Sequence, residues 1–109
     1  MAVENAKQVF DDHLPKRLAN KPDMVEKINS SYKFDITGDG GGTWIVDLTQ
    51  PGGKISQGDG EAACTITMTA PDFVDMMNGK LNGQMAFMSG KLKVAGDMGL
   101  AMKLQTLLG

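Results

Sequence analysis

The 109 residues are enough for one domain, and a hydrophobic content of 41% is enough to build a core. The net charge is only −2 and the basic residues are scattered, which argues against a nucleic-acid-binding surface. No apolar run approaches the roughly 18 residues of a membrane-spanning helix, and the first residues lack the apolar segment of a secretory signal. The single cysteine cannot form an internal disulfide, which suits a reducing compartment. We therefore expect residues 1–109 to form one domain.

The first 30 residues are predicted to be helical. From Val3 to Leu18 apolar residues recur every three or four positions, which indicates an amphipathic helix over residues 3–19. Pro15 lies inside this pattern and should either kink the helix or start a second one. A further short helix is expected over residues 22–28, with a proline at its first position.

Four strands follow. Residues 31–37 and 43–48 alternate between apolar and polar side chains, with Trp44 on the apolar face of the second strand. A glycine-rich turn joins these two strands, so they are predicted to form a hairpin. A short third strand is expected at residues 54–56 and a fourth at residues 63–69.

The second half mixes helices with one more strand. Thr69 has the position of an N-cap, and the same role is predicted for Asn82 and Asp97, each at the start of a short apolar segment. Residues 91–94 alternate as a strand between the second and third of these helices. The order helix, four strands, two short helices, strand, helix predicts an α+β sandwich with a largely antiparallel sheet covered on one face by helices.

The last predicted helix is apolar on two faces. One face is a leucine stripe, Leu100, Leu104, Leu107 and Leu108, and the face beside it carries Met98, Ala101 and Met102. A helix that is apolar on more than one face must be buried on more than one side. Either a second protomer covers the additional face, or the face lines a cavity that a ligand fills.

Methionine is the other unusual feature of the composition. The chain has nine methionines, and seven of them lie between Met68 and Met102. Methionine is flexible and polarisable, and it is frequent on surfaces that accept varied apolar ligands. It also serves as filler in an ordinary core, so composition alone leaves both interpretations open.

Catalytic and metal-binding patterns are not found. His13 is the only histidine and is predicted to be solvated on the polar side of the first helix. Cys64 lies on the apolar face of a strand, where a small buried hydrophobe is expected rather than a nucleophile. The Asp-Gly turns lack the ligand spacing of a calcium loop, and the glycines at 38–42 lack the Lys-Ser/Thr of a phosphate-binding loop. We expect no catalytic residue, no metal site and no cofactor.

Residues 85–105, MAFMSGKLKVAGDMGLAMKLQ, closely resemble the C-terminal signature of the sterol carrier protein 2 domain family. The segments WIVDL at 44–48 and CTITM at 64–68 resemble earlier parts of the same family. The resemblance implies a five-stranded, largely antiparallel sheet covered on one face by about five helices, with a hydrophobic tunnel between sheet and helices. It also implies a non-enzymatic carrier of fatty acids, fatty acyl-CoA or sterols.

The resemblance and the apolar pattern together predict which residues line the tunnel. The candidate lipid-binding residues are Trp44, Phe73, Met76, Met77, Met85, Met88, Leu100, Met102, Leu104 and Gln105. Gln105 is predicted to offer one hydrogen-bonding group in an otherwise apolar channel, the alternative being an ordinary surface glutamine.

Other functions are also compatible with the sequence. One alternative is a protein-interaction or dimerisation module, and another is a lipid-presenting domain of a multifunctional β-oxidation enzyme. The expected partners are a lipid ligand, a membrane in transient contact and a fused or separate β-oxidation enzyme, but no nucleic acid. Relatives often end in a peroxisomal Ser-Lys-Leu tripeptide, whereas this chain ends Leu107-Leu108-Gly109. We expect a cytoplasmic location, or a peroxisomal one if the C-terminus is trimmed or the domain belongs to a larger protein.

Overall fold

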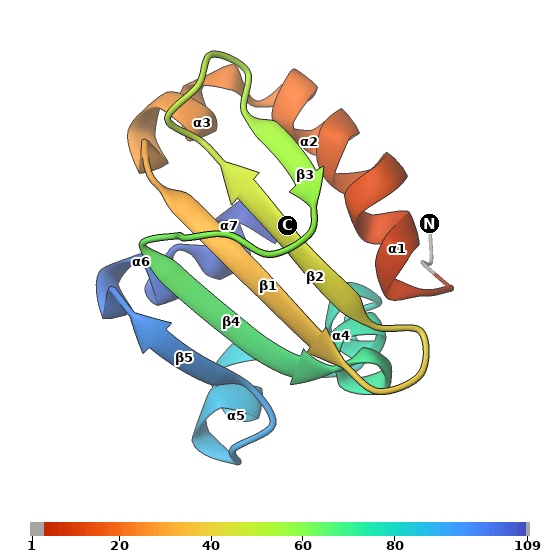
Figure 1. Cartoon of the computed structure of the whole chain (residues 1–109). Helices are drawn as coiled ribbons and strands as arrows, with labels where there is room; N and C mark the ends of the chain where they lie inside the picture. The colour runs from red at the N-terminus through yellow and green to blue at the C-terminus, as the bar shows by residue number, and fades with distance from the viewer. Residues whose placement is uncertain (1–3, 109) are drawn as a thin grey trace.

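The sheet has five strands, and the helices lie against one of its faces (Figure 1). The structure is a computed structural model that describes residues 4–108, apart from the side chains of Gln105 and Thr106. The strands are β1 (Ser31–Thr37), β2 (Gly42–Asp47), β3 (Lys54–Gln57), β4 (Cys64–Thr69) and β5 (Lys93–Gly96). The helices are α1 (Ala6–Gln8), η1 (Val9–His13), α2 (Leu14–Asn20), α3 (Pro22–Ile28), α4 (Ala70–Met77), α5 (Gly83–Met88), α6 (Met98–Met102) and α7 (Leu104–Leu108).

The sheet is mixed, although most of its pairings are antiparallel as predicted. Its strand order is β3-β2-β1-β4-β5, and only the central pair, β1 and β4, is parallel. The parallel pair arises because the segment between β3 and β4 crosses β2 and β1 before the chain re-enters the sheet (Figure 1). This segment is held against the outer face, where Asp59 forms an ion pair with Lys33 and Gly60 lies against Ile45.

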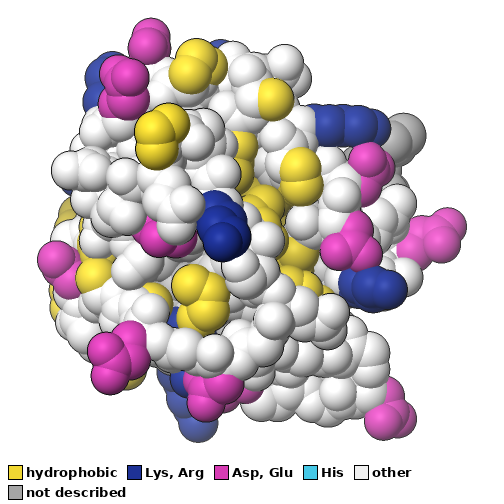
Figure 2. All heavy atoms as spheres, turned by 45° about the horizontal axis from the view of Figure 1, so that its top comes forward, with side chains coloured by type: hydrophobic (Ala, Val, Ile, Leu, Met, Phe, Trp, Pro, Cys, Tyr) yellow, Lys and Arg dark blue, Asp and Glu magenta, His cyan; other side chains and the backbone are white. Residues whose placement is uncertain are grey.

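The core lies between the inner face of the sheet and the helices. In β1 the alternate residues Tyr32, Phe34 and Ile36 are buried, as the period of two in the sequence predicts. On the helical side, Phe10 of η1 stacks on Trp44 of β2 with ring centroids 4.4 Å apart. The outer face is more polar, and Figure 2 shows acidic and basic side chains intermingled over the face that it views.

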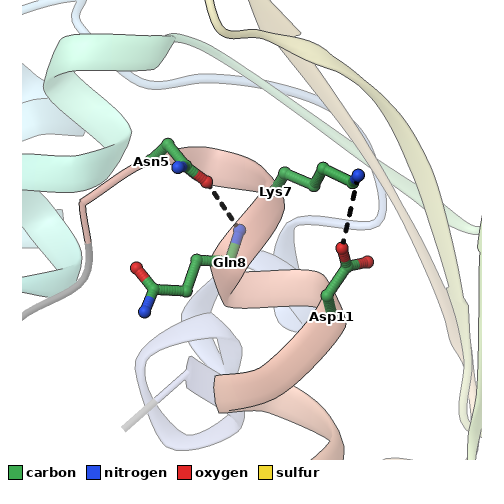
Figure 3. Close-up of polar contacts among 4 residues, drawn as sticks. All are labelled: Asn5, Lys7, Gln8 and Asp11. Atoms are coloured by element: carbon green, nitrogen blue, oxygen red, sulfur yellow. Dashed lines mark hydrogen bonds and ion pairs between the residues drawn. The ribbon is translucent and has the colours of Figure 1, made fainter.

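Local capping explains where the first helix begins. The side-chain oxygen of Asn5 accepts a hydrogen bond from the backbone N–H of Gln8 at 2.8 Å (Figure 3). One turn further, Lys7 and Asp11 form an i, i+4 ion pair at 3.8 Å, also shown in Figure 3. Both side chains are exposed, and exposed i, i+4 ion pairs typically add only about a few tenths of a kilocalorie per mole to stability.

Pro15 is accommodated without a break in this helix. The turn before it is widened into the π segment η1, in which the N–H of Leu14 bonds to the carbonyl of Val9, five residues earlier. Proline has no N–H to donate, so the residues before it must satisfy their carbonyls differently from those of a regular α-helix. The predicted irregularity is therefore present, as a π-bulge that leaves α1, η1 and α2 continuous.

The three predicted N-caps are confirmed. In each case the side-chain oxygen accepts a hydrogen bond from a backbone N–H in the first turn: Thr69 from Asp72 at 3.4 Å, Asn82 from Gln84 at 2.8 Å, and Asp97 from Gly99 at 2.8 Å. These caps satisfy N–H groups that a helix leaves without internal partners. They define where α4, α5 and α6 begin.

Two elements near the C-terminus differ from the prediction. The strand expected at residues 91–94 begins only at Lys93, because the N–H groups of Lys91 and Leu92 both donate to Ala86 and so close α5. The single final helix is divided into α6 and α7. The N–H of Lys103 bonds to the carbonyl of Leu100, a tighter turn than the α-helical one, which ends α6.

Candidate functional site

A cavity of about 580 Å³ lies where α4, α5, β5, α6 and α7 meet. Its walls come from these elements and from the turn that joins α4 to α5. The lining residues are Met76, Met77, Gly79, Leu81, Asn82, Gly83, Gln84, Phe87, Leu92, Val94, Met98, Ala101, Met102, Leu104 and Leu108. The volume falls within the roughly 300–1,000 Å³ of ordinary small-molecule sites.

The cavity has a buried base and an open mouth. Leu92, Leu104 and Leu108 are buried and close its inner end. At the mouth, the exposed fraction is 84% for Met102 and 50% for Met98, and Phe87 is 45% exposed. A ligand can therefore enter between α5 and α6 and reach an apolar interior.

The lining residues offer almost no charge. No Asp, Glu, Lys, Arg, His, Cys or Tyr is among the described residues of the lining. The side-chain oxygen of Asn82 is already occupied by the backbone N–H groups of Gln84 and Met85 as the cap of α5. The cavity is suited to a long apolar group, which binds by leaving water rather than through directed polar contacts.

Four of the predicted site residues line the cavity. Met76 and Met77 are half-buried on α4, Met102 stands at the mouth on α6, and Leu104 lies in the base on α7. The second apolar face of the last helices, formed by Met98, Ala101 and Met102, also faces the cavity. Of the two explanations for that face, the structure favours the cavity.

Three predicted residues lie in the core and outside the cavity lining. Trp44, Phe73 and Leu100 are buried and do not contribute to its lining. The strand order explains the position of Trp44, because β2 lies beyond β1 and β4 from the cavity at β5, and Phe10 stacks over it. Phe73 is on the same helix as Met76 but faces Phe10, with ring centroids 5.6 Å apart.

Two further predicted residues lie on the surface. Met85 and Met88 are 67% and 78% exposed on α5, because this helix places Ala86 in the core and Phe87 at the cavity. They are not part of the lining. The side chain of Gln105 lies outside the described residues, so its predicted role in the channel stays a prediction.

The cavity also contains residues that were not predicted. Phe87, Leu92, Val94 and Leu108 line it, together with Leu81 in the α4–α5 turn. A sequence signal existed for some of them, since Leu92 and Val94 alternate with lysines along the β5 segment. No local pattern marks a turn residue such as Leu81 as part of a cavity wall.

Groups with potential chemistry lie outside the cavity lining. Cys64 is buried, and this burial, with a smaller contribution from Asp97, raises the pKa of its thiol and keeps it protonated. Burial likewise raises the pKa of Tyr32, whose hydroxyl donates to the carbonyl of Leu100 at 2.6 Å. Within residues 4–108 no three His, Cys, Asp or Glu side chains gather as a metal site.

His13 is not the solvated surface residue that was predicted. Its ring is half-buried, and Nε2 lies 3.1 Å from the carbonyl oxygen of Leu108, at hydrogen-bonding distance. The prediction was wrong because the polar side of the first helix faces the C-terminal end of α7. That contact joins residues 95 positions apart, which helical periodicity does not reveal.

The fold and cavity lead to a comparison with known proteins. The sequence profile of the SCP-2 sterol transfer family matches residues 11–109. This chain belongs to that family. A similar solved structure, palmitated SCP2L2 from Aedes aegypti, has a TM-score of 0.75 and 27% identity over 99% of this chain and 95% of that one. The SCP-2 fold expected from the resemblance is confirmed.

Relatives with longer chains carry the same SCP-2 domain. Over 109 residues the chain is 41% identical to hydroxysteroid dehydrogenase-like protein 2 of Homo sapiens, covering 98% of this chain and 25% of that protein. Over 106 residues it is 42% identical to human sterol carrier protein 2, covering 94% of this chain and 19% of that protein. The chain thus spans about a quarter or less of the length of these curated relatives. In the described part of the chain, no helix has the length and apolar character to cross a bilayer.

Proposed function

We propose that this SCP-2 domain binds single-chain lipids, fatty acids first among them, in the 580 Å³ cavity and transfers them. The observation that carries the proposal is an open cavity whose described lining is mostly apolar and includes no charged side chain. A palmitated relative of the same fold supports it. Fatty acyl-CoA and sterols are further candidate ligands, because flexible methionines such as Met76 and Met77 adapt to ligands of different shape.

The size of the hydrophobic effect fits a carrier. About ten methylenes removed from water contribute roughly 8 kcal/mol at about 0.8 kcal/mol each. This corresponds to a dissociation constant near 1 μM, before the cost of ordering the chain weakens it. Such an affinity is high enough to hold a lipid in water and low enough to release it.

The proposed role is that of a non-enzymatic carrier. The lining offers apolar contact and no described acid, base or nucleophile, so the bound lipid would leave chemically unchanged. A partner enzyme, fused or separate, would then act on the lipid. Support for such a partner comes from the longer relatives, which include a hydroxysteroid dehydrogenase-like protein.

A charge placed in the cavity wall tests the proposal. In Met77→Lys the ammonium group would have to enter an apolar wall, so the dissociation constant of a fluorescent fatty acid should rise at least about tenfold. Met85→Lys is the matched control, because Met85 is exposed and lies outside the lining. The measurement is a titration in buffer without membranes. Equal affinity in Met77→Lys and wild type would contradict a lipid site in this cavity.

A further inference from the structure

Thioether side chains are concentrated in the wall of the cavity. Four of the nine methionines are among its described lining residues: Met76 and Met77 on α4, and Met98 and Met102 on α6. The described lining includes no Cys, His, Tyr or Trp, so the thioether is its only readily oxidised group. An oxidising group carried by a bound lipid would therefore meet methionine sulfur first.

The other described methionines provide an internal comparison. Met85 and Met88 are exposed on α5 but do not line the cavity. Met24 and Met68 are buried in the core outside it. The two lining methionines of α4 are half-buried. A small oxidant in water should thus attack the exposed methionines of α5 before those of α4, whereas an oxidant bound in the cavity should attack the lining methionines first.

The sulfur of Met76 lies close to the start of α5. A Cβ atom added to Gly83 would be 3.6 Å from this Sδ atom, and Gly83 itself lines the cavity. The lining residues on either side of Gly83 are Asn82 and Gln84, whose side-chain amides carry hydrogen-bond donors. A thioether and amide groups therefore share one wall of a mostly apolar cavity. This combination suits a lipid with a polar, oxidising group in the middle of its chain.

We propose that the lining methionines, Met76 and Met77 above all, reduce fatty-acid hydroperoxides to hydroxy fatty acids in the cavity. The inference rests on the proposed function, because the hydroperoxide must first bind as other fatty acids do. The charged carboxylate would stay in water at the open mouth, which places a hydroperoxide in the middle of the chain inside, beside α4. A thioether does not attack a carboxylate or a thioester, so ordinary fatty acids and acyl-CoA still leave unchanged.

The reaction transfers one oxygen atom and needs no further oxidant or reductant. A lone pair of the methionine sulfur attacks the outer oxygen of the hydroperoxide, so that a sulfur–oxygen bond forms and the oxygen–oxygen bond breaks. The inner oxygen leaves with the electron pair of that bond and takes up the proton that the outer oxygen releases, carried by water from the open mouth. Sulfur is oxidised to the sulfoxide, and the hydroperoxide is reduced to the alcohol.

Binding in the cavity supplies the rate and the selectivity of this step. Holding the peroxide beside the sulfur replaces a collision between two molecules in solution with a reaction inside one complex. Hydrogen bonds from the amides of Asn82 and Gln84 would stabilise the charge that develops on the leaving oxygen. Each methionine reacts once, and a methionine sulfoxide reductase restores it.

Isotope-labelled hydroperoxide tests the proposal by following the oxygen atom. Wild-type protein is incubated with linoleic acid hydroperoxide that carries ¹⁸O in its peroxide group, with a metal chelator present, and each methionine is analysed by peptide mass spectrometry. We expect ¹⁸O in Met76 and Met77 at a level at least about tenfold above that in the exposed methionines of α5. One hydroxy fatty acid should appear for each sulfoxide, and saturating palmitate should suppress both. With hydrogen peroxide the order should be reversed, because the methionines of α5 are the more exposed.

Leucine substitutions separate the thioether from the apolar volume that it fills. Met76→Leu/Met77→Leu keeps a similar apolar volume without the sulfur. Its palmitate affinity should stay within about threefold of wild type, while its formation of hydroxy fatty acid should fall at least about fivefold. Met85→Leu/Met88→Leu is the matched control outside the lining, and it should form hydroxy fatty acid at the wild-type rate.

The outcomes separate this reaction from lipid carriage. Recovery of the bound hydroperoxide unchanged, or equal labelling of the α4 and α5 methionines, would overturn the inference and leave the proposed function intact. So would a Met76→Leu/Met77→Leu variant that forms hydroxy fatty acid as fast as wild type. If neither palmitate nor the hydroperoxide binds the wild-type protein, the proposed function itself is contradicted, and this inference falls with it.

Discussion

Tyr32 joins the sheet to the wall of the cavity through one buried hydrogen bond. Its hydroxyl donates to the carbonyl of Leu100 in α6 at 2.6 Å, and both residues are buried. Tyr32→Phe would leave this carbonyl without its partner and away from water, at a cost of about 1–3 kcal/mol. We expect the free energy of unfolding measured by urea denaturation to fall by that amount, and amide exchange to accelerate more in α6 than in α4. Unchanged stability and exchange would show that this bond does not hold the cavity wall.

Cys64 gives a residue-scale prediction that depends on pH. Burial raises the pKa of its thiol, so the folded protein holds this proton at a pH where the unfolded chain begins to lose it. The contribution to stability is fully present below the ordinary thiol pKa and is lost as pH rises through the higher pKa of the folded state. At about pH 8, a thiol reagent should label Cys64 at least about a hundredfold more slowly in the folded protein than in urea. Similar rates in both states would contradict a buried thiol.

Single residues also show what the sequence could and could not predict about the site. Met77 lines the cavity, and the cap and apolar stripe of its helix had indicated that this side chain faces inward; its lipid-binding role stays a prediction. The apolar position of Trp44 in its strand led to its prediction as a cavity residue. That position correctly indicates burial in the core but does not say which part of the core Trp44 occupies. Distinguishing the cavity wall from the rest of the core requires the strand order, because the cavity lies at the β5 edge of the sheet and Trp44 lies near the opposite edge.

At the scale of elements, α7 is held in place by the first helix. Nε of Arg17 donates to the carbonyl of Leu107 at 2.9 Å, and Nε2 of His13 lies 3.1 Å from the carbonyl of Leu108. These carbonyls belong to the last turn of α7, where a helix leaves acceptors unused and where cations are favourable. The contacts position Leu104 and Leu108 in the base of the cavity.

Arg17→Ala tests this contact between α2 and α7. The loss of a charged hydrogen-bond donor that is only partly buried should lower the free energy of unfolding by about 1–2 kcal/mol. Lys16→Ala is the control, because Lys16 is exposed and makes only a surface ion pair with Asp12. Urea denaturation of both variants provides the measurement. An equal, small effect in the two variants would show that Arg17 does not secure α7.

Elements with local signals were predicted well, and those that depend on distant contacts were not. Caps such as Asn82 act within one turn, so the sequence is sufficient to place the start of α5. The parallel pairing of β1 with β4 depends on how the segment after β3 crosses the sheet, which periodicity does not encode. The division between α6 and α7 also has no local marker, because Lys103 suits the interior of a helix.

At the scale of the whole molecule, the cavity must be solvated or occupied. A closed, dry void of 580 Å³ would cost about 14 kcal/mol at about 24 cal/mol per Å³. That is close to the upper end of the total stability of an ordinary domain, about 5–15 kcal/mol. The exposed methionines at the mouth leave the cavity open to water, so this cost is avoided. A lipid that fills it would replace this water with apolar contact and stabilise the fold.

The methionines allow the central claim, a lipid in the cavity between α4 and α7, to be tested in one spectrum. Met76 and Met77 line the cavity, whereas Met24 and Met68 are buried in the core outside it and serve as internal controls. With ¹³C-labelled methionine methyl groups and bound palmitate, we expect intermolecular nuclear Overhauser effects from the acyl chain to Met76 and Met77. None should reach Met24 or Met68. Contacts to the core methionines alone, or no contact to any methionine at saturating palmitate, would contradict the account.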